Sequence, residues 1–202
     1  TRRSSDLFVY NVTVWLRRVR ESGVALPRIE WRPFMLAQIN SSEDGSEWKA
    51  WEQSDKDTRG LLAFKVGISA MKQNDGLYDQ FHINVLEAKH EAREDIGDLE
   101  ILMDCAKRAG LDTERLRIEI NDPSLIEYIG RSHVEAVTRY GAFGVPTFVF
   151  PNGNSAFLKL IYPPKERAAD IYEDLMKVMS TWDNIGEIKR PQPPWPSGVK
   201  RD

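Results

Sequence analysis

The sequence contains few of the residues that build disulfides and metal sites. Its 202 residues include one cysteine, Cys105, and three histidines. A single cysteine excludes an internal disulfide and a cysteine-based zinc site, and the scattered histidines lack metal-ligand spacing. No apolar run reaches the length of about 18 residues that indicates a membrane-spanning helix, and the N-terminal residues lack the small-residue cleavage site of a signal peptide. We therefore expect a cytoplasmic protein without a metal site.

The sequence also lacks any block of charge of one sign. Its 28 basic and 31 acidic residues are interspersed and leave a net charge of -3. Without a basic stripe or a polybasic patch, neither nucleic acid nor a membrane surface is an expected partner. The hydrophobic content of 41% is enough for one globular domain, or for one domain with an insertion.

Most of the chain has the apolar spacing of helices. Val12, Trp15 and Val19 are spaced for one face of a helix, and Gly23 provides its C-terminal stop. A block of further helical patterns follows, and it contains no convincing strand. The predicted helices cover about 58–73, 77–92, 98–109 and 124–140, and a last one covers about 164–182.

Three segments have the character of strands. Residues 29–33 alternate apolar and charged side chains and end at a proline, which predicts a strand there. Residues 146–150 and 156–162 are apolar runs on either side of Asn152 and Gly153, which favour a hairpin turn. The first of these runs opens with a proline, which cannot donate a ladder hydrogen bond and so must mark the start of the strand.

In chain order the elements are a helix, a strand, a helical block, a proline-started strand, its hairpin partner and a helix. A strand before the first helix would complete a thioredoxin fold with a helical insertion. The segments GAFGVPTFVF (141–150), IEWRPFML (29–36) and EAREDIGDLEILMDCAKRAGLD (91–112) resemble the DsbA-like thioredoxin family. The resemblance spans about residues 10–180 and is closest to the FrnE-type dithiol oxidoreductases and the 2-hydroxychromene-2-carboxylate isomerases.

This resemblance implies an α/β, thioredoxin-like fold with an all-helical insertion. The thioredoxin-like domain is expected at residues 1–57 and 138–183, and the insertion at residues 58–137. Residues 184–202 form a proline-rich tail, which is expected to be an extended arm or disordered.

The start of the first helix is where the family carries its chemistry. Oxidoreductase members open this helix with Cys-Pro-x-Cys, whose thiolate the helix N-terminus stabilises. Aligning on Tyr10 puts Asp6 and Val9 on the two cysteine positions, so the redox dithiol is missing or degenerate. The glutathione-activating serine of the isomerases falls on Asp6, although Ser4 or Ser5 could replace it in a shifted register. The alternative for Asp6 is a helix N-cap.

The residues before Tyr10 make a poor central strand, because they are charged and rich in serine. Three explanations stay open. The protein has lost its redox motif and kept the fold as a binding scaffold, or the sequence as given lacks the strand and the Cys-x-x-Cys, or an altered gene start has replaced them.

The resemblance also assigns a ligand site. Its proline loop is expected to be cis at Pro146 and to offer the backbone of Val145 to an extended ligand, with Thr147 and Tyr10 as further contacts. The expected ligand is a peptide or a small thiol, with glutathione as the candidate cofactor and a homodimer as the candidate assembly. Three functions are then possible: a thioredoxin-like protein of the disulfide oxidoreductase type with a missing or degenerate dithiol, a glutathione-dependent isomerase or transferase, or a non-catalytic binding module.

The remaining reactive or aromatic residues are expected to be structural. Cys105 has the position of a buried packing residue. His82, His90 and His133 lack a partner at a known spacing and are expected to be structural or on the surface. The other residues belong to two groups: Trp15, Trp31, Phe34, Phe143 and Phe148 are expected in the core, and Trp48 and Trp51 in the core or along a groove.

Overall fold

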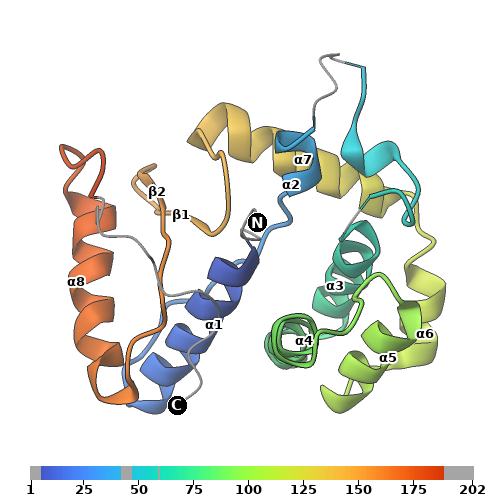
Figure 1. The fold of residues 1–202 in the computed structure, drawn as a ribbon, viewed down its shortest axis with the longest axis horizontal. Coiled ribbons are helices and arrows are strands. Elements are labelled where there is room, and N and C mark those ends of the chain that lie inside the picture. The colour runs from blue at the N-terminus through green and yellow to red at the C-terminus, as the bar shows by residue number, and fades with distance from the viewer. Residues whose placement is uncertain (1–5, 42–46, 59, 189–202) are drawn as a thin grey trace. The chain divides into compact units, whose positions relative to one another are not determined.

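The computed structural model describes residues 6–41, 47–58 and 60–188 (Figure 1). The chain forms two compact units. One comprises Thr1–Trp31 and Val137–Asp202, and the other comprises Arg32–Ala136. The insertion predicted at 58–137 falls inside the second unit except for its last residue, and the predicted domain boundaries stay a prediction.

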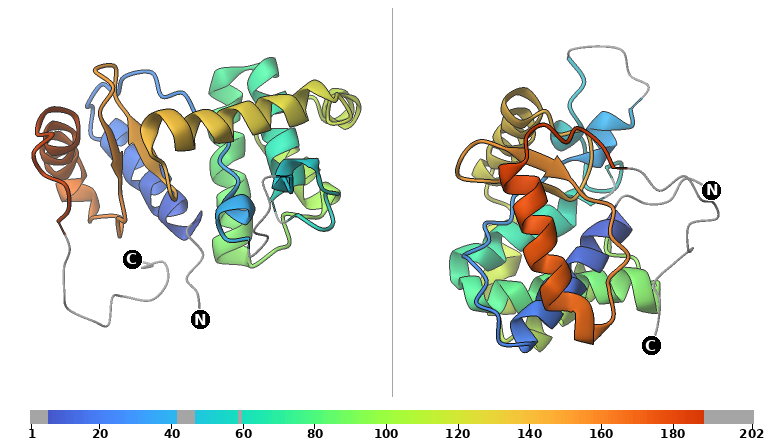
Figure 2. Two further views of the ribbon diagram at one scale, coloured as in Figure 1. Left: turned by 90° about the horizontal axis from the view of Figure 1, so that it is seen from above. Right: turned by 90° about the vertical axis from the view of Figure 1, so that its left-hand side faces the viewer.

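The first unit is built around two helices and a hairpin. It contains α1 (Asp6–Glu21), β1 (Thr147–Val149), β2 (Ser155–Phe157), the 3-10 turn η3 (Lys165–Arg167) and α8 (Ala168–Thr181). Helix α1 lies beside α8, and β2 also contacts α8 (Figures 1 and 2). Trp15 of α1 is fully buried and donates its indole N–H to the carbonyl of Ala168 at 3.0 Å. This bond ties the first helix to the last.

The predicted hairpin is confirmed, with β1 and β2 antiparallel and Thr147 paired with Phe157. Strand β1 begins directly after the proline, as expected. Strand β2 is shorter than the predicted 156–162, because the chain beyond it bonds to α1. There the carbonyl of Leu160 accepts a hydrogen bond from Asn11 Nδ2 at 2.8 Å instead of a ladder bond.

The strand predicted at 29–33 is wrong, since β1 and β2 are the only strands among the described residues. A strand needs a neighbouring strand to bond its backbone, whereas at the end of this segment side chains of α7 (Ser124–Tyr140) bond to it. Ser132 Oγ donates to the carbonyl of Pro33 at 2.9 Å, and the amide of Met35 donates to His133 Nδ1 at 3.2 Å.

All the regular secondary structure in the described part of the second unit is helical. It contains α2 (Leu36–Ile39), η1 (Ala50–Glu52), α3 (Leu61–Gln73), α4 (Asp75–Glu87), the π-turn η2 (Ala88–Ala92), α5 (Leu99–Arg108), α6 (Thr113–Glu119) and most of α7 (Ser124–Tyr140). The four predicted helices of the block are present within three residues of their expected bounds when η2 is counted as the end of α4. The sequence prediction missed α2, η1 and α6.

Short polar side chains set the starts of these helices. Asn74 Oδ1 accepts from the amides of Gly76 and Leu77 at the start of α4. Asp98 caps α5 in the same way, and Asp112 caps α6 by accepting from a backbone amide in its first turn. These caps satisfy amides that have no partner within the helix.

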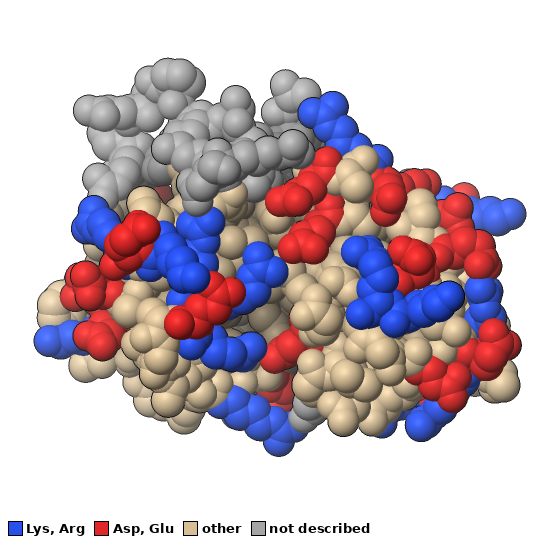
Figure 3. Space-filling view, turned by 90° about the horizontal axis from the view of Figure 1, so that it is seen from below, with Lys and Arg blue, Asp and Glu red and all other residues tan. Residues whose placement is uncertain are grey.

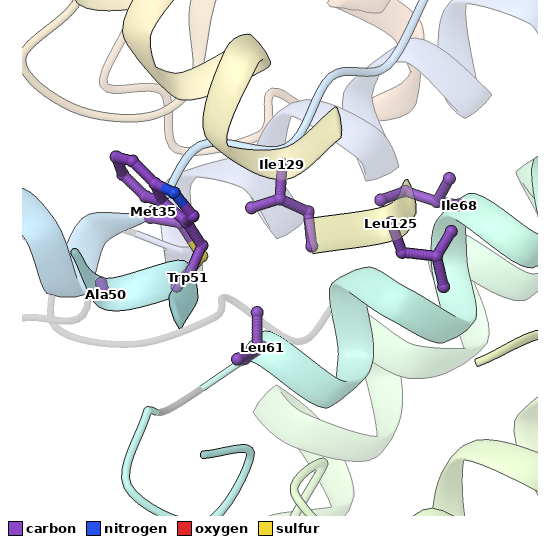
Figure 4. Packing of buried hydrophobic residues seen from close by; sticks show 7 residues of the cluster. All are labelled: Met35, Ala50, Trp51, Leu61, Ile68, Leu125 and Ile129. Atoms are coloured by element: carbon purple, nitrogen blue, oxygen red, sulfur yellow. The ribbon is translucent and has the colours of Figure 1, made fainter. Parts of the chain in front are cut away.

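A compact apolar cluster lies in the second unit (Figure 4). Its buried members are Met35, Ala50, Trp51, Leu61, Ile68, Leu125 and Ile129, with Trp48 packed at its edge. The prediction that Trp51 belongs to the core is therefore confirmed. Residues from α3, α7, η1 and the segment before α2 meet in this cluster, so it joins parts of the unit that are far apart in sequence.

The aromatic residues expected in the core differ in their burial. Trp15 and Phe34 are buried, as predicted, and Trp31 and Phe148 are half-buried. The prediction for Phe143 is wrong, because 64% of it is exposed. It lies in the loop before β1, where its ring contacts one other ring and otherwise faces solvent.

Acidic and basic side chains lie next to one another on the face drawn in Figure 3. The mixing of charge expected from the sequence is therefore seen on that face. Within the described ranges, no helix combines the length and the apolar character needed to cross a membrane.

Candidate functional site

The loop before β1 is the centre of the candidate site. Its chain turns at Gly141, which has a φ of 64°, and the peptide bond between Val145 and Pro146 is cis. Thr147 Oγ1 donates to the carbonyl of Gly144 at 2.8 Å, which closes the loop onto the start of the strand. Pro146 is buried, whereas Val145 and Thr147 are half-buried. The three predicted ligand contacts of this loop thus form one short stretch.

The pairing of the hairpin decides where the loop's backbone points. Leu158 N donates to the carbonyl of Pro146 at 3.1 Å, so the next pair along, Thr147 with Phe157, is of the non-hydrogen-bonded type. The backbone groups of Thr147, and of Val149 two residues on, therefore point away from β2. This edge of β1 carries no further strand in the part of the chain that the structure describes.

Val145 lies in the bend directly before this strand. No hydrogen bond joins its backbone N–H or C=O to another described residue. Among the described residues, the amide and the carbonyl of Val145 therefore keep their capacity to bond. Thr147 and Val149 present alternate backbone groups along the open edge of β1, which is the arrangement that accepts an added strand, and Val145 lies just before this edge.

Aromatic rings connect this loop with the first helix. The ring of Phe157 lies so close to Gly144 that a Cβ there would be 3.2 Å from it, and its centroid is 4.9 Å from that of Phe143. Lys159 Nζ lies 5.4 Å from the Phe157 centroid and 5.8 Å from the centroid of Phe8 in α1. Phe157, Lys159 and Phe8 thus connect the loop with the start of α1.

The sequence analysis did not single out Phe8, Phe157 or Lys159. A usable signal was present, because Phe157 and Lys159 are two residues apart in an extended segment and so share a face. Their relation to the proline loop depends on the hairpin register.

The predicted residues of the first helix lie in its first two turns. Asp6 is the first residue of α1, where the helix dipole favours a carboxylate. Val9 is half-buried, and its carbonyl accepts from Thr13 Oγ1 at 2.9 Å. Tyr10 is 2% exposed, so its side chain is not open to solvent. The assignment of Asp6 and Val9 to catalytic positions and of Tyr10 to the ligand stays a prediction.

The described site contains no thiol. The one cysteine, Cys105, is buried in α5 of the second unit, as predicted. Burial raises the pKa of its thiol, and a hydrogen bond from Arg108 Nη2 at 3.3 Å opposes that rise. Ser4 and Ser5, the alternative residues for a glutathione-activating serine, lie outside the described residues.

Two of the histidines, His82 and His133, are structural in the way the sequence suggested. His133 is buried between the rings of Phe34 and Trp51, and burial lowers its pKa. Burial also lowers the pKa of His82 to about 4, beside the hydroxyl of Tyr78. Among the described residues, no group of three or more His, Cys, Asp or Glu side chains could hold a metal ion.

Comparison with known proteins gives one family. A family model described as a DSBA-like thioredoxin domain matches residues 16–160. No curated protein matches the chain. The family match confirms the recognition made from the sequence and its α/β thioredoxin-like fold class. The matched region includes the proline loop and both strands, and it begins after Asp6, Val9 and Tyr10.

Proposed function

The chain belongs to the DSBA-like thioredoxin domain family of thioredoxin-fold oxidoreductases and isomerases, and we propose that its proline loop binds an extended peptide. The open backbone of Val145 carries this proposal. Its amide and carbonyl bond to no other described residue and lie two residues before Thr147, where the open edge of β1 begins, so a peptide in strand conformation can bond to Val145 and to this edge.

The chemistry beside this edge is that of binding. Thiol–disulfide exchange by a Cys-x-x-Cys needs two thiols, and the given sequence has Asp6 and Val9 at the positions that match the family's cysteines. The remaining thiol, Cys105, is buried in the other unit. The proposed function is therefore that of a thioredoxin-like protein of the disulfide oxidoreductase type, whose dithiol is missing or degenerate in the given sequence and whose proline loop holds a peptide.

A backbone-modified peptide tests this function. The probe is a short peptide of alternating threonine and valine, and the comparison peptide carries one N-methyl group on the backbone. The methyl group removes a donor and blocks strand pairing, while the side chains stay the same. Each lost hydrogen bond contributes about 1 kcal/mol, so we expect roughly five-fold to ten-fold weaker binding.

Amide resonances of the isotope-labelled protein locate the binding. The unmodified peptide should shift the amides of Val145, Thr147 and Val149 and slow their hydrogen exchange. Equal affinity of the methylated peptide, or shifts that avoid these three residues, would contradict strand addition. Displacement of the peptide by glutathione at the same amides would instead favour a small-thiol site.

A further inference from the structure

The turn of the hairpin contains a chemically labile pair of residues. Asn152 and Gly153 are the one Asn-Gly pair in the sequence, and both are exposed. In such a pair the backbone nitrogen of the glycine can attack the side-chain amide of the asparagine, because a glycine has no Cβ to hinder the approach. Asparagine followed by glycine therefore loses ammonia more readily than asparagine followed by a larger residue.

The side chain of Asn152 connects this turn with the last helix. Its Nδ2 donates to the carbonyl of Ser180 at 2.6 Å, and Asn154 Nδ2 donates to the same carbonyl at 2.9 Å. Ser180 lies in the last turn of α8, where carbonyls have no partner within the helix and where no basic residue stands. The two side-chain amides therefore satisfy a carbonyl that the helix leaves open.

The folded turn restrains the loss of ammonia. Gly153 has a φ of 91°, and its N–H donates to the carbonyl of Phe150 at 2.9 Å. Asn152 Oδ1 accepts from the amide of Asn154 at 3.1 Å. Both the nitrogen that must attack and the amide that it must reach are thus held by hydrogen bonds. The turn has to open before the two can meet, so the rate of the reaction depends on local opening of the turn.

We propose that Asn152 is a deamidation site whose conversion to aspartate or isoaspartate releases the end of α8 from the hairpin. The Gly153 nitrogen bonds to Cγ of Asn152, the bond from Cγ to Nδ2 breaks, and Nδ2 leaves as ammonia with the proton of the attacking amide. Water then opens the resulting succinimide ring at either of its carbonyl carbons. The net reaction consumes water and releases ammonia, with no oxidation or reduction.

The product cannot keep the bond to α8. A carboxylate has no hydrogen to donate, so the contact with the carbonyl of Ser180 changes from a hydrogen bond to a repulsion between oxygens. The new charge also lies at the C-terminal end of α8, where the helix dipole disfavours an anion. Isoaspartate in addition routes the backbone through Cβ and so lengthens the turn.

Ageing of the natural protein tests the site. After incubation in mildly alkaline buffer, peptide mapping by mass spectrometry should find deamidation at Asn152 before it appears at Asn40. Asn40 is the internal comparison, because it is also exposed and bonded to a backbone carbonyl, that of Leu36, but is followed by serine. Urea should speed the reaction at Asn152 several-fold, because it opens the turn. Equal rates at the two asparagines would refute the site, and a rate at Asn152 that urea leaves unchanged would refute its restraint by the fold.

Two aspartate variants test the consequence. Asn152→Asp has the side chain of the aspartate product, and it should lower the melting temperature by about 2–4 °C and speed hydrogen exchange in the last turn of α8. Asn184→Asp is the matched control. Asn184 is exposed and follows α8 by three residues, and no hydrogen bond joins its side chain to another described residue. The control therefore adds the same charge near the same helix end without removing a bond, and it should change both quantities much less.

The variants also decide whether the inference fails. If Asn152→Asp melts and exchanges like the natural protein, or if Asn184→Asp changes both quantities to the same extent, the bond from Asn152 does not hold the end of α8 and its release is refuted. None of these measurements depends on the proposed peptide binding.

Discussion

The contact between Gly130 and Trp51 gives the sharpest prediction for the stability of the second unit. Gly130 lies in α7, and a Cβ built on it would be 2.6 Å from Trp51 Nε1 and 3.0 Å from Cε2. Real Cβ atoms do not approach ring atoms so closely, so Gly130→Ala must displace the indole. Trp51 is 8% exposed and belongs to the apolar cluster, which leaves the ring little room.

The expected effect is a net loss of stability. Overpacking a core typically costs about 1–3 kcal/mol, and the upper end applies because the clash involves three ring atoms. Alanine recovers about 1 kcal/mol relative to glycine inside a helix. Gly130→Ala should therefore lower the free energy of unfolding by about 2 kcal/mol, measured by urea denaturation with far-ultraviolet circular dichroism.

Gly67→Ala is the matched control. Gly67 is also buried inside a helix of the second unit, α3, but its added Cβ would be 3.7 Å from Tyr78 and 3.9 Å from Phe81. These are ordinary contacts, so the gain in helix propensity should dominate and stabilise the protein by up to about 1 kcal/mol. If both variants change stability in the same direction and by the same amount, the steric explanation is refuted.

Three further predictions concern buried polar groups. Because burial lowers the pKa of His82 from 6.5 to about 4, the unfolded chain binds more protons between these values. Stability should thus fall as pH drops from 6.5 to 4, by at most about 3 kcal/mol, and a His82→Gln variant with the same pH slope would contradict this. Cys105 should react slowly with iodoacetamide in the native protein and fast in urea, and rapid native labelling would refute its burial. Trp15→Phe removes the hydrogen bond to Ala168 and should cost about 1–3 kcal/mol in chemical denaturation, whereas an unchanged midpoint would show that the bond contributes nothing.

The elements predicted from the sequence are those with local signals. Helix α7 has the bounds 124–140 in the prediction and in the structure, because its apolar spacing runs through five turns. The hairpin was predictable from its proline, its turn residues and two apolar runs. Helix α6 was missed because it has seven residues, too few for a periodic pattern, although Asp112 offered a capping signal.

The strand predicted at 29–33 is wrong because the segment's own sequence does not specify the partners of its backbone. Alternating side chains show that a segment suits an extended conformation, but a strand also needs a neighbour for its backbone. The carbonyl of Pro33 and the amide of Met35 bond to Ser132 and His133, about a hundred residues later in the chain. The sequence of the segment alone does not show whether its backbone bonds to side chains of a distant helix or to a second strand.

The same limit applies to the register of the hairpin. A two-residue turn at Asn152 and Gly153 would pair the residues on either side of it and bring Lys159 opposite Pro146. In the structure, Phe150 N instead donates to the carbonyl of Asn154 at 2.9 Å, so the turn is one residue longer. A change of one residue in register moves every pairing along the hairpin. The turn length therefore decides that Leu158, and not Lys159, bonds to Pro146.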